Sequence, residues 1–403
     1  MSNQEDFIRV PYGSTVHGKE EIDAVMRVLK TSTQMSVNVE NFEEQISDTF
    51  DKQYGVMVNS GTSALYLAVE ALKLPKNSEV ITPALTFATT VGCLVKNDLI
   101  PAFVDVGLDT YCIDVDKIEE KINENTSAIC APDLMGNICD WEAIKDLSER
   151  YSLKIIHDSA DTLGAKLNGI STGSFSDISI TSFYGSHVIN GAGNGGFIAT
   201  NDEEIYKKCR LLRSWGRSSS LYQDSEAIEN RFNVELEGIQ YDAKFVFEEI
   251  GYQLEPSEIS AAFAIEQLKK LDINSTLRNK YFDSHTNFFK KYDDFFVLPN
   301  QNKQAQTAWL AFPLIVRDEA PFNRTDMQIF LEKRNIQTRV VFTGNILRQP
   351  GYRDINCIGK AEDFLNADIV MKGGILLACH HGLDEDMLSH LYESCGLFMN
   401  QFI

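Results

Sequence analysis

Short apolar runs alternate with amphipathic stretches from Glu20 to about Arg213, and this alternation restricts the chain to few architectures. Short β-rich runs separated by helices are typical of a mostly parallel, twisted sheet whose two faces are covered by helices. We therefore expect an α/β fold with seven strands here, at Val56–Val58, Val80–Thr82, Ala102–Val106, Ser127–Ala131, Ile155–Asp158, Ile178–Phe183 and Gly196–Thr200. The expected helices include Glu21–Leu29, Thr62–Leu72, Asp116–Ile122 and Trp141–Tyr151.

The rest of the chain has a different pattern. Residues 218–249 are polar and irregular, and we expect a long excursion or flap there. From Pro256 the pattern resumes with a helix, Ser257–Leu271, and a smaller α+β unit follows. Its expected strands are Thr307–Val316, Thr338–Phe342 and Gly374–Ala378. We therefore divide the chain into a large domain, residues 1–250, and a smaller C-terminal domain, residues 251–403.

Composition excludes several classes of protein. The formal net charge of −21 argues against a nucleic-acid surface, because phosphate binding needs clustered Lys and Arg. Met1 to Val10 is polar and acidic, so we expect no signal peptide, and no apolar run approaches the roughly 20 residues that span a bilayer. The eight cysteines are scattered without a CxxC pair. We expect a cytoplasmic protein with free thiols, no metal site, no membrane and no nucleic-acid partner.

Polar residues follow the predicted strands where ligands of open α/β sheets bind. In the run 59–63, Gly61 lets the backbone approach a ligand, and the following helix start offers free N–H groups to a phosphate. The alternative is an ordinary helix cap by Ser60 or Thr62. After the next strand, the ring of Phe87 could stack on a flat cofactor or belong to the core.

Two further groups of polar residues follow later strands. We call these two groups and the two above the polar stations. Asp158 ends a buried strand and could pair with a protonated ring nitrogen, or Asp158 or Ser159 could cap a helix. Ser182 could give a hydroxyl to a phosphate, and His187 would stand beside the same ligand, ahead of the Gly-rich turn 190–196. A single His is more often structural. The order and spacing of all four stations together favour a cofactor site.

This order resembles the DegT/StrS group of nucleotide-sugar aminotransferases, which are fold-type I enzymes of pyridoxal 5′-phosphate (PLP). The resemblance runs from about Pro11 to the C-terminal helix. It implies a large cofactor-binding domain with a mostly parallel seven-stranded sheet, plus a smaller α+β C-terminal domain. It also implies a homodimer with shared active sites. The cofactor-binding residues that it implies are Gly61, Thr62, Ser63, Phe87, Asp158, Asp161, Ser182 and Gln253.

Those residues have distinct roles in the resemblance. Gly61, Thr62 and Ser182 would contact the cofactor phosphate, and Phe87 would stack on the pyridine ring. Asp158 would pair with the ring nitrogen, and Asp161 would approach the cofactor hydroxyl. Gln253 stands where the family has an Asn that reaches the phosphate of the neighbouring subunit.

The main departure is at His187, where the family has the lysine that holds the cofactor covalently. Imidazole forms no stable Schiff base, so the cofactor would be bound non-covalently, most naturally as pyridoxamine 5′-phosphate (PMP). A branch of sugar 3-dehydratases has this substitution, and the segments Thr338–Leu347 and Cys379–Leu383 are similar to that branch as well. Adjacent histidines rarely share a metal, so the pair at 380–381 predicts no metal site.

The resemblance implies removal of the carbon-3 hydroxyl of a nucleotide-linked 4-keto-6-deoxyhexose, in making a dideoxysugar for a surface polysaccharide such as lipopolysaccharide O-antigen, or for a natural product. His187 would be the base, since an imidazole can accept and return a proton near neutral pH. The cysteine spacing favours the branch without an iron–sulfur cluster, in which L-glutamate restores the amine. The alternatives are a sugar aminotransferase that lacks the lysine, and a catalytically silent sensor of nucleotide sugars.

The match is weaker around the substrate. Glu255 stands where the family carries an Arg, and this reversed charge disfavours an anionic co-substrate there. Arg339 and Arg217 are our candidates for substrate contacts, because Arg suits a diphosphate or a carboxylate. Arg213 and Arg348 are further cations that the sequence alone does not rank.

Overall fold

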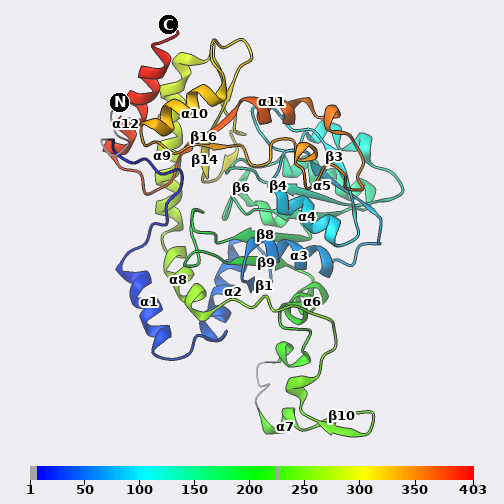
Figure 1. Cartoon of the computed structure of the whole chain (residues 1–403). Coiled ribbons are helices and arrows are strands. Elements are labelled where there is room, and N and C mark those ends of the chain that lie inside the picture. The colour runs from blue at the N-terminus through cyan, green and yellow to red at the C-terminus, as the bar shows by residue number, and fades with distance from the viewer. Residues whose placement is uncertain (1–6, 223–226) are drawn as a thin grey trace.

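The computed structural model describes residues 7–222 and 227–403, and its larger part is built on one seven-stranded sheet (Figure 1). The strand order is β1-β9-β8-β5-β4-β2-β3, and β9 alone runs antiparallel to its neighbours. This arrangement confirms the expected mostly parallel sheet. The strands are β1 (Tyr54–Val58), β2 (Glu79–Pro83), β3 (Ile100–Val104), β4 (Thr126–Pro132), β5 (Lys154–Asp158), β8 (Ile178–Ser182) and β9 (Gly196–Thr200).

Helices cover both faces of this sheet, which explains why its strands are apolar without alternation. In β5, Ile156 packs into the core under one helical layer, whereas Ile155 packs into the core on the opposite face with Trp141. The first layer contains α3 (Gly61–Ala71), α4 (Ala88–Lys96) and α6 (Glu203–Arg213). The opposite face carries α5 (Trp141–Tyr151) and α2 (Val37–Thr49).

One expected helix is wrong. Residues 116–122 form two 3₁₀ turns, η2 (Val115–Lys117) and η3 (Glu119–Lys121). These turns are closed by hydrogen bonds between residues three positions apart, such as Ile118 N–H to Val115 O. A segment of seven residues gains too few α-helical hydrogen bonds to offset helix nucleation.

The smaller α+β unit has a four-stranded antiparallel sheet of order β12-β14-β16-β15. Its strands are β12 (Phe296–Val297), β14 (Ala311–Val316), β16 (Gly374–Ala378) and β15 (Arg339–Val340). Its helices are α9 (Leu271–Phe289), α10 (Arg324–Lys333), α11 (Leu365–Gly373) and α12 (Glu385–Met399). β15 is shorter than the expected strand 338–342, because the backbone of Phe342 turns into the left-handed region at φ 41°.

Helix α8 (Glu258–Leu268) packs against α1 (Lys19–Leu29) and α2. Helix α8, which follows the predicted domain boundary at residue 251, therefore packs on helices that precede it. The division into domains at this residue stays a prediction. Within the part of the chain that the structure describes, no helix is long and apolar enough to span a membrane.

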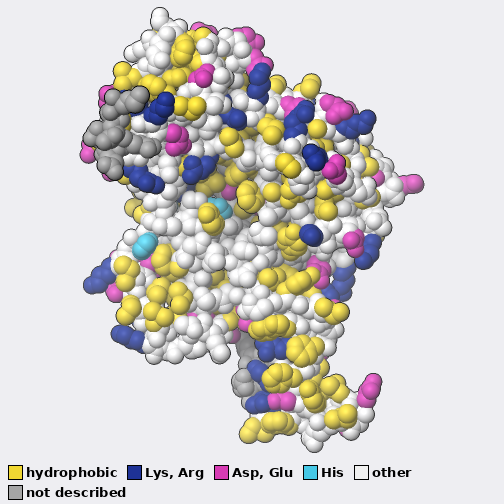
Figure 2. All heavy atoms as spheres, viewed as in Figure 1, with side chains coloured by type: hydrophobic (Ala, Val, Ile, Leu, Met, Phe, Trp, Pro, Cys, Tyr) yellow, Lys and Arg dark blue, Asp and Glu magenta, His cyan; other side chains and the backbone are white. Residues whose placement is uncertain are grey.

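Residues 218–222 and 227–250, which we call the arm, project away from the body of the molecule (Figure 1). The arm contains η5 (Ser218–Leu221), α7 (Ile228–Arg231), η6 (Ala243–Phe245) and a hairpin of β10 (Val234–Leu236) and β11 (Ile239–Tyr241). Hydrophobic side chains gather on its surface (Figure 2). The exposed ones are Tyr222, Ile228, Phe232, Leu236, Ile239, Tyr241, Phe245, Phe247 and Ile250.

Candidate active site

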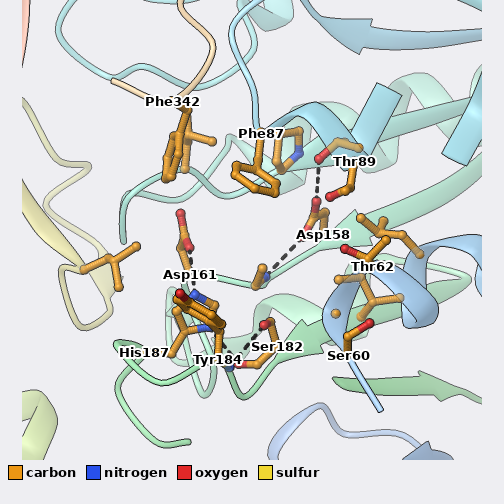
Figure 3. A pocket seen from close by; sticks show the side chains of 18 of the residues that line it. Ser60, Thr62, Phe87, Thr89, Asp158, Asp161, Ser182, Tyr184, His187 and Phe342 are labelled. Carbon is orange, nitrogen blue, oxygen red and sulfur yellow. Dashed lines mark hydrogen bonds and ion pairs between the residues drawn. The ribbon is translucent and has the colours of Figure 1, made fainter. Parts of the chain in front are cut away.

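A pocket of about 440 Å³ opens at the carboxyl ends of β4, β5 and β8 and the start of α3 (Figure 3). Its lining residues come from distant parts of the chain, from Tyr12 near the N-terminus to Leu310 and Phe342 of the smaller unit. This is the edge at which open α/β sheets bind ligands, so all four polar stations of the sequence meet at one cavity.

The first station forms one end of the pocket, where α3 begins. Ser60 caps the helix by accepting a hydrogen bond from the Ser63 N–H at 3.1 Å. A Cβ on Gly61 would lie 2.6 Å from the Cβ of Ser182, so only glycine lets the two segments approach this closely. Thr62 and Ser182 line the pocket beside it, whereas Ser63 does not and donates its hydroxyl to Asn59 Oδ1 at 2.6 Å. The helix start and two hydroxyls suit a phosphate.

Asp158 is buried and lies between Phe87 and Thr62 in the lining of the pocket (Figure 3). Thr90 donates its hydroxyl to Oδ2 at 2.8 Å, and the Ala160 N–H donates to Oδ1 at 3.2 Å. Burial raises the pKa of the carboxyl, and the Thr90 hydrogen bond opposes that rise. Within the described residues Asp158 has no ion pair, so a protonated ring nitrogen in the pocket would supply the missing cation. The residues present therefore fit a PLP-type group.

Two aromatic rings form the wall opposite the phosphate end (Figure 3). Phe87 is 53% exposed, so it is not a core residue, and its position suits stacking on a flat ring. Phe342 meets it edge-on, with ring centroids 5.9 Å apart. Thr343 donates its hydroxyl to Thr86 O at 2.7 Å, which fastens this loop of the smaller unit to the loop that carries Phe87.

His187 has a defined tautomer. Its Nδ1 lies 2.8 Å from Ser182 O, and because a carbonyl only accepts, Nδ1 carries the hydrogen and Nε2 is the free base. Burial lowers the imidazole pKa to about 4, a shift opposed by the bond to Ser182 and assisted by the cation of Arg278. His187 is therefore neutral at pH 7. Among the described residues no lysine lines the pocket, so none of those lining residues could bind PLP as a Schiff base.

Asp161 faces this imidazole, with Oδ1 3.8 Å from His187 Nε2. Its Oδ2 accepts the Met135 N–H at 2.8 Å. Burial raises the carboxyl pKa to about 7, so near neutral pH Asp161 exists in both its protonated and its ionised form, whereas His187 is neutral. A proton gained by His187 would sit beside an acid that can carry the opposite charge.

The other predicted residues lie outside the pocket lining. Gln253 is exposed and pairs with Ser214 at the base of the arm. Arg217 stacks on Trp215, with 4.4 Å from guanidinium to ring centroid, and lies 3.9 Å from Glu255. Arg339 is exposed and lies 5.5 Å from the ring centroid of Tyr12.

The two unranked cations have structural partners. Arg213 is buried and donates to Glu43 and, at 2.7 Å, to Met57 O. Arg348 is paired with Asp368. Both guanidinium groups therefore already have a carboxylate partner within the chain.

Several residues of the pocket were not predicted from the sequence. Tyr12 reaches the cavity from an extended N-terminal segment, in which Val10 pairs with Ile336 and Pro11 O accepts from His380 Nε2 at 3.0 Å. Asp133 lines the pocket and accepts from His157 Nε2 at 2.8 Å. The other missed lining residues include Thr89, Thr90, Tyr184, Leu310 and Phe342. A polar residue directly after a strand, such as Asp133, carried the same signal as Asp158.

Both histidines at 380–381 form hydrogen bonds within the chain. His380 donates to Pro11 O, and His381 accepts from Arg278. In the described ranges, no group of three or more His, Cys, Asp or Glu side chains is arranged to hold a metal ion.

Comparison with known proteins shows that the chain is similar to aminotransferases and to sugar 3-dehydratases. The family model of the DegT/DnrJ/EryC1/StrS aminotransferases matches residues 16–395. The chain is 30% identical to dTDP-4-dehydro-2,6-dideoxy-D-glucose 3-dehydratase of Saccharopolyspora spinosa, covering 96% of this chain and 86% of that protein. It is also 30% identical to GDP-4-keto-6-deoxy-D-mannose 3-dehydratase of Yersinia pseudotuberculosis, covering 96% and 98%.

Two solved structures are similar over nearly the whole chain. The Escherichia coli GDP-4-keto-6-deoxy-D-mannose-3-dehydratase with bound hydrated PLP matches with a TM-score of 0.86 and 28% identity, covering 96% of this chain and 99% of that one. A GDP-4-keto-6-deoxymannose-3-dehydratase with a trapped PLP–glutamate geminal diamine matches with a TM-score of 0.86 and 26% identity, covering 96% and 100%.

Proposed function

Because the chain belongs to the DegT/DnrJ/EryC1/StrS aminotransferase family, a family of PLP-dependent enzymes, we propose that it is a PLP/PMP-dependent sugar 3-dehydratase. Its substrate would be a nucleotide-linked 4-keto-6-deoxyhexose, and the reaction would remove the hydroxyl on carbon 3. One observation carries the proposal: a neutral, half-buried His187 faces a pocket whose described lining contains no lysine.

The pocket residues divide the work of holding the cofactor. When bound, PMP would supply an amine that condenses with the sugar ketone and a conjugated ring that takes up the electron pair left on carbon when a proton is removed, so that the carbon-3 oxygen can leave with its own bonding pair. Gly61, Thr62 and Ser182 would bind its phosphate, and Phe87 would stack on its ring. Asp158 would keep the ring nitrogen protonated, since a buried carboxylate without an ionic partner is stabilised by a cation. We propose non-covalent binding because no lysine lines the pocket.

His187 would move the proton. Nε2 is the unprotonated atom, so it can accept a proton from a carbon held above it and then return that proton to the departing hydroxyl oxygen. The imidazolium formed in between is buried, and the Asp161 carboxylate, 3.8 Å away, would stabilise it. An imidazole thus performs the acid–base work of the family's lysine without capturing the cofactor.

We propose L-glutamate as the amino donor that restores PMP. A 3-dehydratase of similar structure has been trapped with PLP and glutamate joined, which supports this choice. Glu255, whose charge disfavours an anion, lies 3.9 Å from Arg217, and that cation offsets part of the charge.

We further propose that two copies of the chain form a homodimer and complete each other's sites. The lining of the pocket contains three Asp and neither Lys nor Arg, although its ligands would carry phosphates. The apolar arm and the exposed Gln253 at its base are suited to contact a second copy. Arg339, at the Tyr12 side of the pocket, and Arg217 remain our candidates for substrate contacts.

The activity test uses the purified protein, PMP, L-glutamate and 4-keto-6-deoxy sugars linked to GDP, dTDP or CDP. We expect loss of the carbon-3 hydroxyl and release of ammonia with at least one of them. An aminotransferase would instead leave nitrogen in the sugar, and a silent sensor would bind the sugar without turnover. Either result would contradict the proposal. His187→Asn, which keeps the size and polarity but removes the base, is the inactive control.

A further inference from the structure

Arg278 of α9 is fully buried behind the wall of the pocket, and each of the three nitrogens of its guanidinium donates at least one hydrogen bond. Nη2 donates to Ser186 O at 3.0 Å, and Nη1 donates to Trp309 O and Leu310 O at 3.1 Å each. Nε donates to Nδ1 of His381 at 3.2 Å. One planar side chain therefore joins the loop of His187, the segment that carries Leu310, and the C-terminal histidine pair.

The charge of this side chain has no direct counterion. All its hydrogen-bond acceptors are neutral, and among the described residues no carboxylate lies within ion-pair distance of it. Burial lowers the guanidinium pKa to about 10, so Arg278 is still a cation at neutral pH. A buried cation held only by neutral groups is costly, and packing alone would be served better by an apolar side chain.

The positive charge of Arg278 acts on the imidazole of His187. The titratable and charged groups around its ring are Asp161 at 3.8 Å, Tyr184 with ring centroids 6.0 Å apart, and Arg278 behind its loop. Tyr12, Asp133 and Asp158 line the same pocket. Of these, Arg278 is the group whose charge opposes protonation of the imidazole, and it also acts on Asp161.

The loop is fixed at two points. His187 Nδ1 is bonded to Ser182 O, and Ser186 O, one residue before the histidine, is bonded to Arg278. Together the two bonds leave the ring little freedom to turn Nε2 away from Asp161.

We infer that Arg278 is a positioning residue for the proposed dehydration: it fixes the loop of His187 and, in addition to the effect of burial, opposes protonation of the imidazole before the sugar arrives. The inference rests on the proposed function of His187, but its central test needs no substrate. An active site that must start with a neutral base gains from a permanent nearby cation that cannot itself exchange protons at neutral pH.

The test compares Arg278→Met, which removes the charge, with Arg278→Lys, which keeps the charge but loses the planar fork. The full-length protein is labelled with ¹³C in the histidine rings and titrated by NMR, and His187→Asn identifies the signal. We expect the midpoint of His187 to rise by about one pH unit or more in Arg278→Met, as for loss of one nearby charge. In Arg278→Lys the midpoint should stay near that of the parent, while kcat falls at least about tenfold because the loop is less fixed.

Arg213→Met is the matched control. Arg213 is as buried as Arg278 but is paired with Glu43 and lies outside the pocket lining. Its loss should lower Tm without moving the His187 midpoint. If Arg278→Met does not fold, Arg278→Gln removes the same charge and retains two donors. A folded neutral variant at position 278 with the parental His187 midpoint would overturn the inference, whether or not the protein proves to be a dehydratase.

Discussion

His187 and Asp161 face each other in a buried corner of the pocket, and burial moves their pKa values in opposite directions. The lowered pKa of His187 favours its neutral imidazole, and the raised pKa of Asp161 favours its protonated carboxyl. Both shifts have the same cause, because low dielectric surroundings penalise the charged form of either group. The pair is therefore poised for one proton to move without leaving a lone buried charge.

Replacing His187 by lysine should restore the covalent chemistry of the wider family. We expect His187→Lys to bind PLP as a yellow Schiff base that borohydride reduces, and to lose detectable removal of the carbon-3 hydroxyl. Absorbance spectra and mass measurement of the reduced protein check the first part, and product analysis checks the second. A lysine variant that dehydrates as fast as the parent would show that our role for His187 is wrong.

Asp161 should make the stability of the cofactor-free protein depend on pH. Its folded pKa, about 7, is above the unfolded value of about 3.9, so the native state loses stability as pH rises from about 4 through 7. Asp161→Asn avoids this loss. We expect the variant to be more stable than the parent by roughly 2–4 kcal/mol at pH 8, with little difference at pH 4. Urea unfolding at the two pH values measures it, and a difference independent of pH would contradict the assignment.

At the scale of the elements, the seven apolar runs became the seven strands of the sheet, because strands buried on both faces need continuous apolar sequence. Sequence spacing also located the polar stations, since each directly follows a strand. It could not locate Tyr12, Phe342 or Arg278. These side chains reach the site through loop paths and domain packing, for which no local periodicity exists.

The start of α3 offers a test of the phosphate end. Gly61→Ala would place a Cβ 2.6 Å from Ser182 Cβ and push apart the two segments that are proposed to hold the phosphate. We expect PMP to bind at least about tenfold more weakly, measured by calorimetry, because helix N–H groups must approach an anion closely. Gly351→Ala, where an added Cβ meets no atom within 4 Å, is the control and should leave the Kd unchanged.

At the scale of the whole molecule, two surfaces remain unexplained by one copy of the chain: an acidic pocket for phosphate ligands and an apolar arm in solvent. A symmetric dimer would explain both if the arm of one copy packs beside the pocket of the other. Two chains that each carry a net charge of −21 repel each other at long range. Apolar contact between the two copies would have to offset this repulsion.

Charging the arm tests this arrangement. Ile239 is 65% exposed and Phe247 is 56% exposed, so replacing both by Asp should leave the fold of one copy intact but separate a dimer. We expect light scattering to report a dimer for the parent and a monomer for the double variant, with weaker PMP binding. Ile329→Asp, on exposed α10, should remain dimeric. A parent that is monomeric, or a charged arm that does not affect assembly, would refute the dimer.

The N-terminal segment has a consequence for biosynthesis. Tyr12 is held in the pocket by partners such as His380, which bonds to Pro11 from 369 positions further along the chain. At a translation rate of about 5–20 residues per second, roughly 20–70 seconds separate the appearance of the two on the ribosome. During that interval the sheet can form, but the first residues have nowhere to dock. The cavity is thus completed only after His380, just before α12, has emerged, and a nascent chain stopped earlier would carry the cofactor-binding residues of the sheet without Tyr12 held in place.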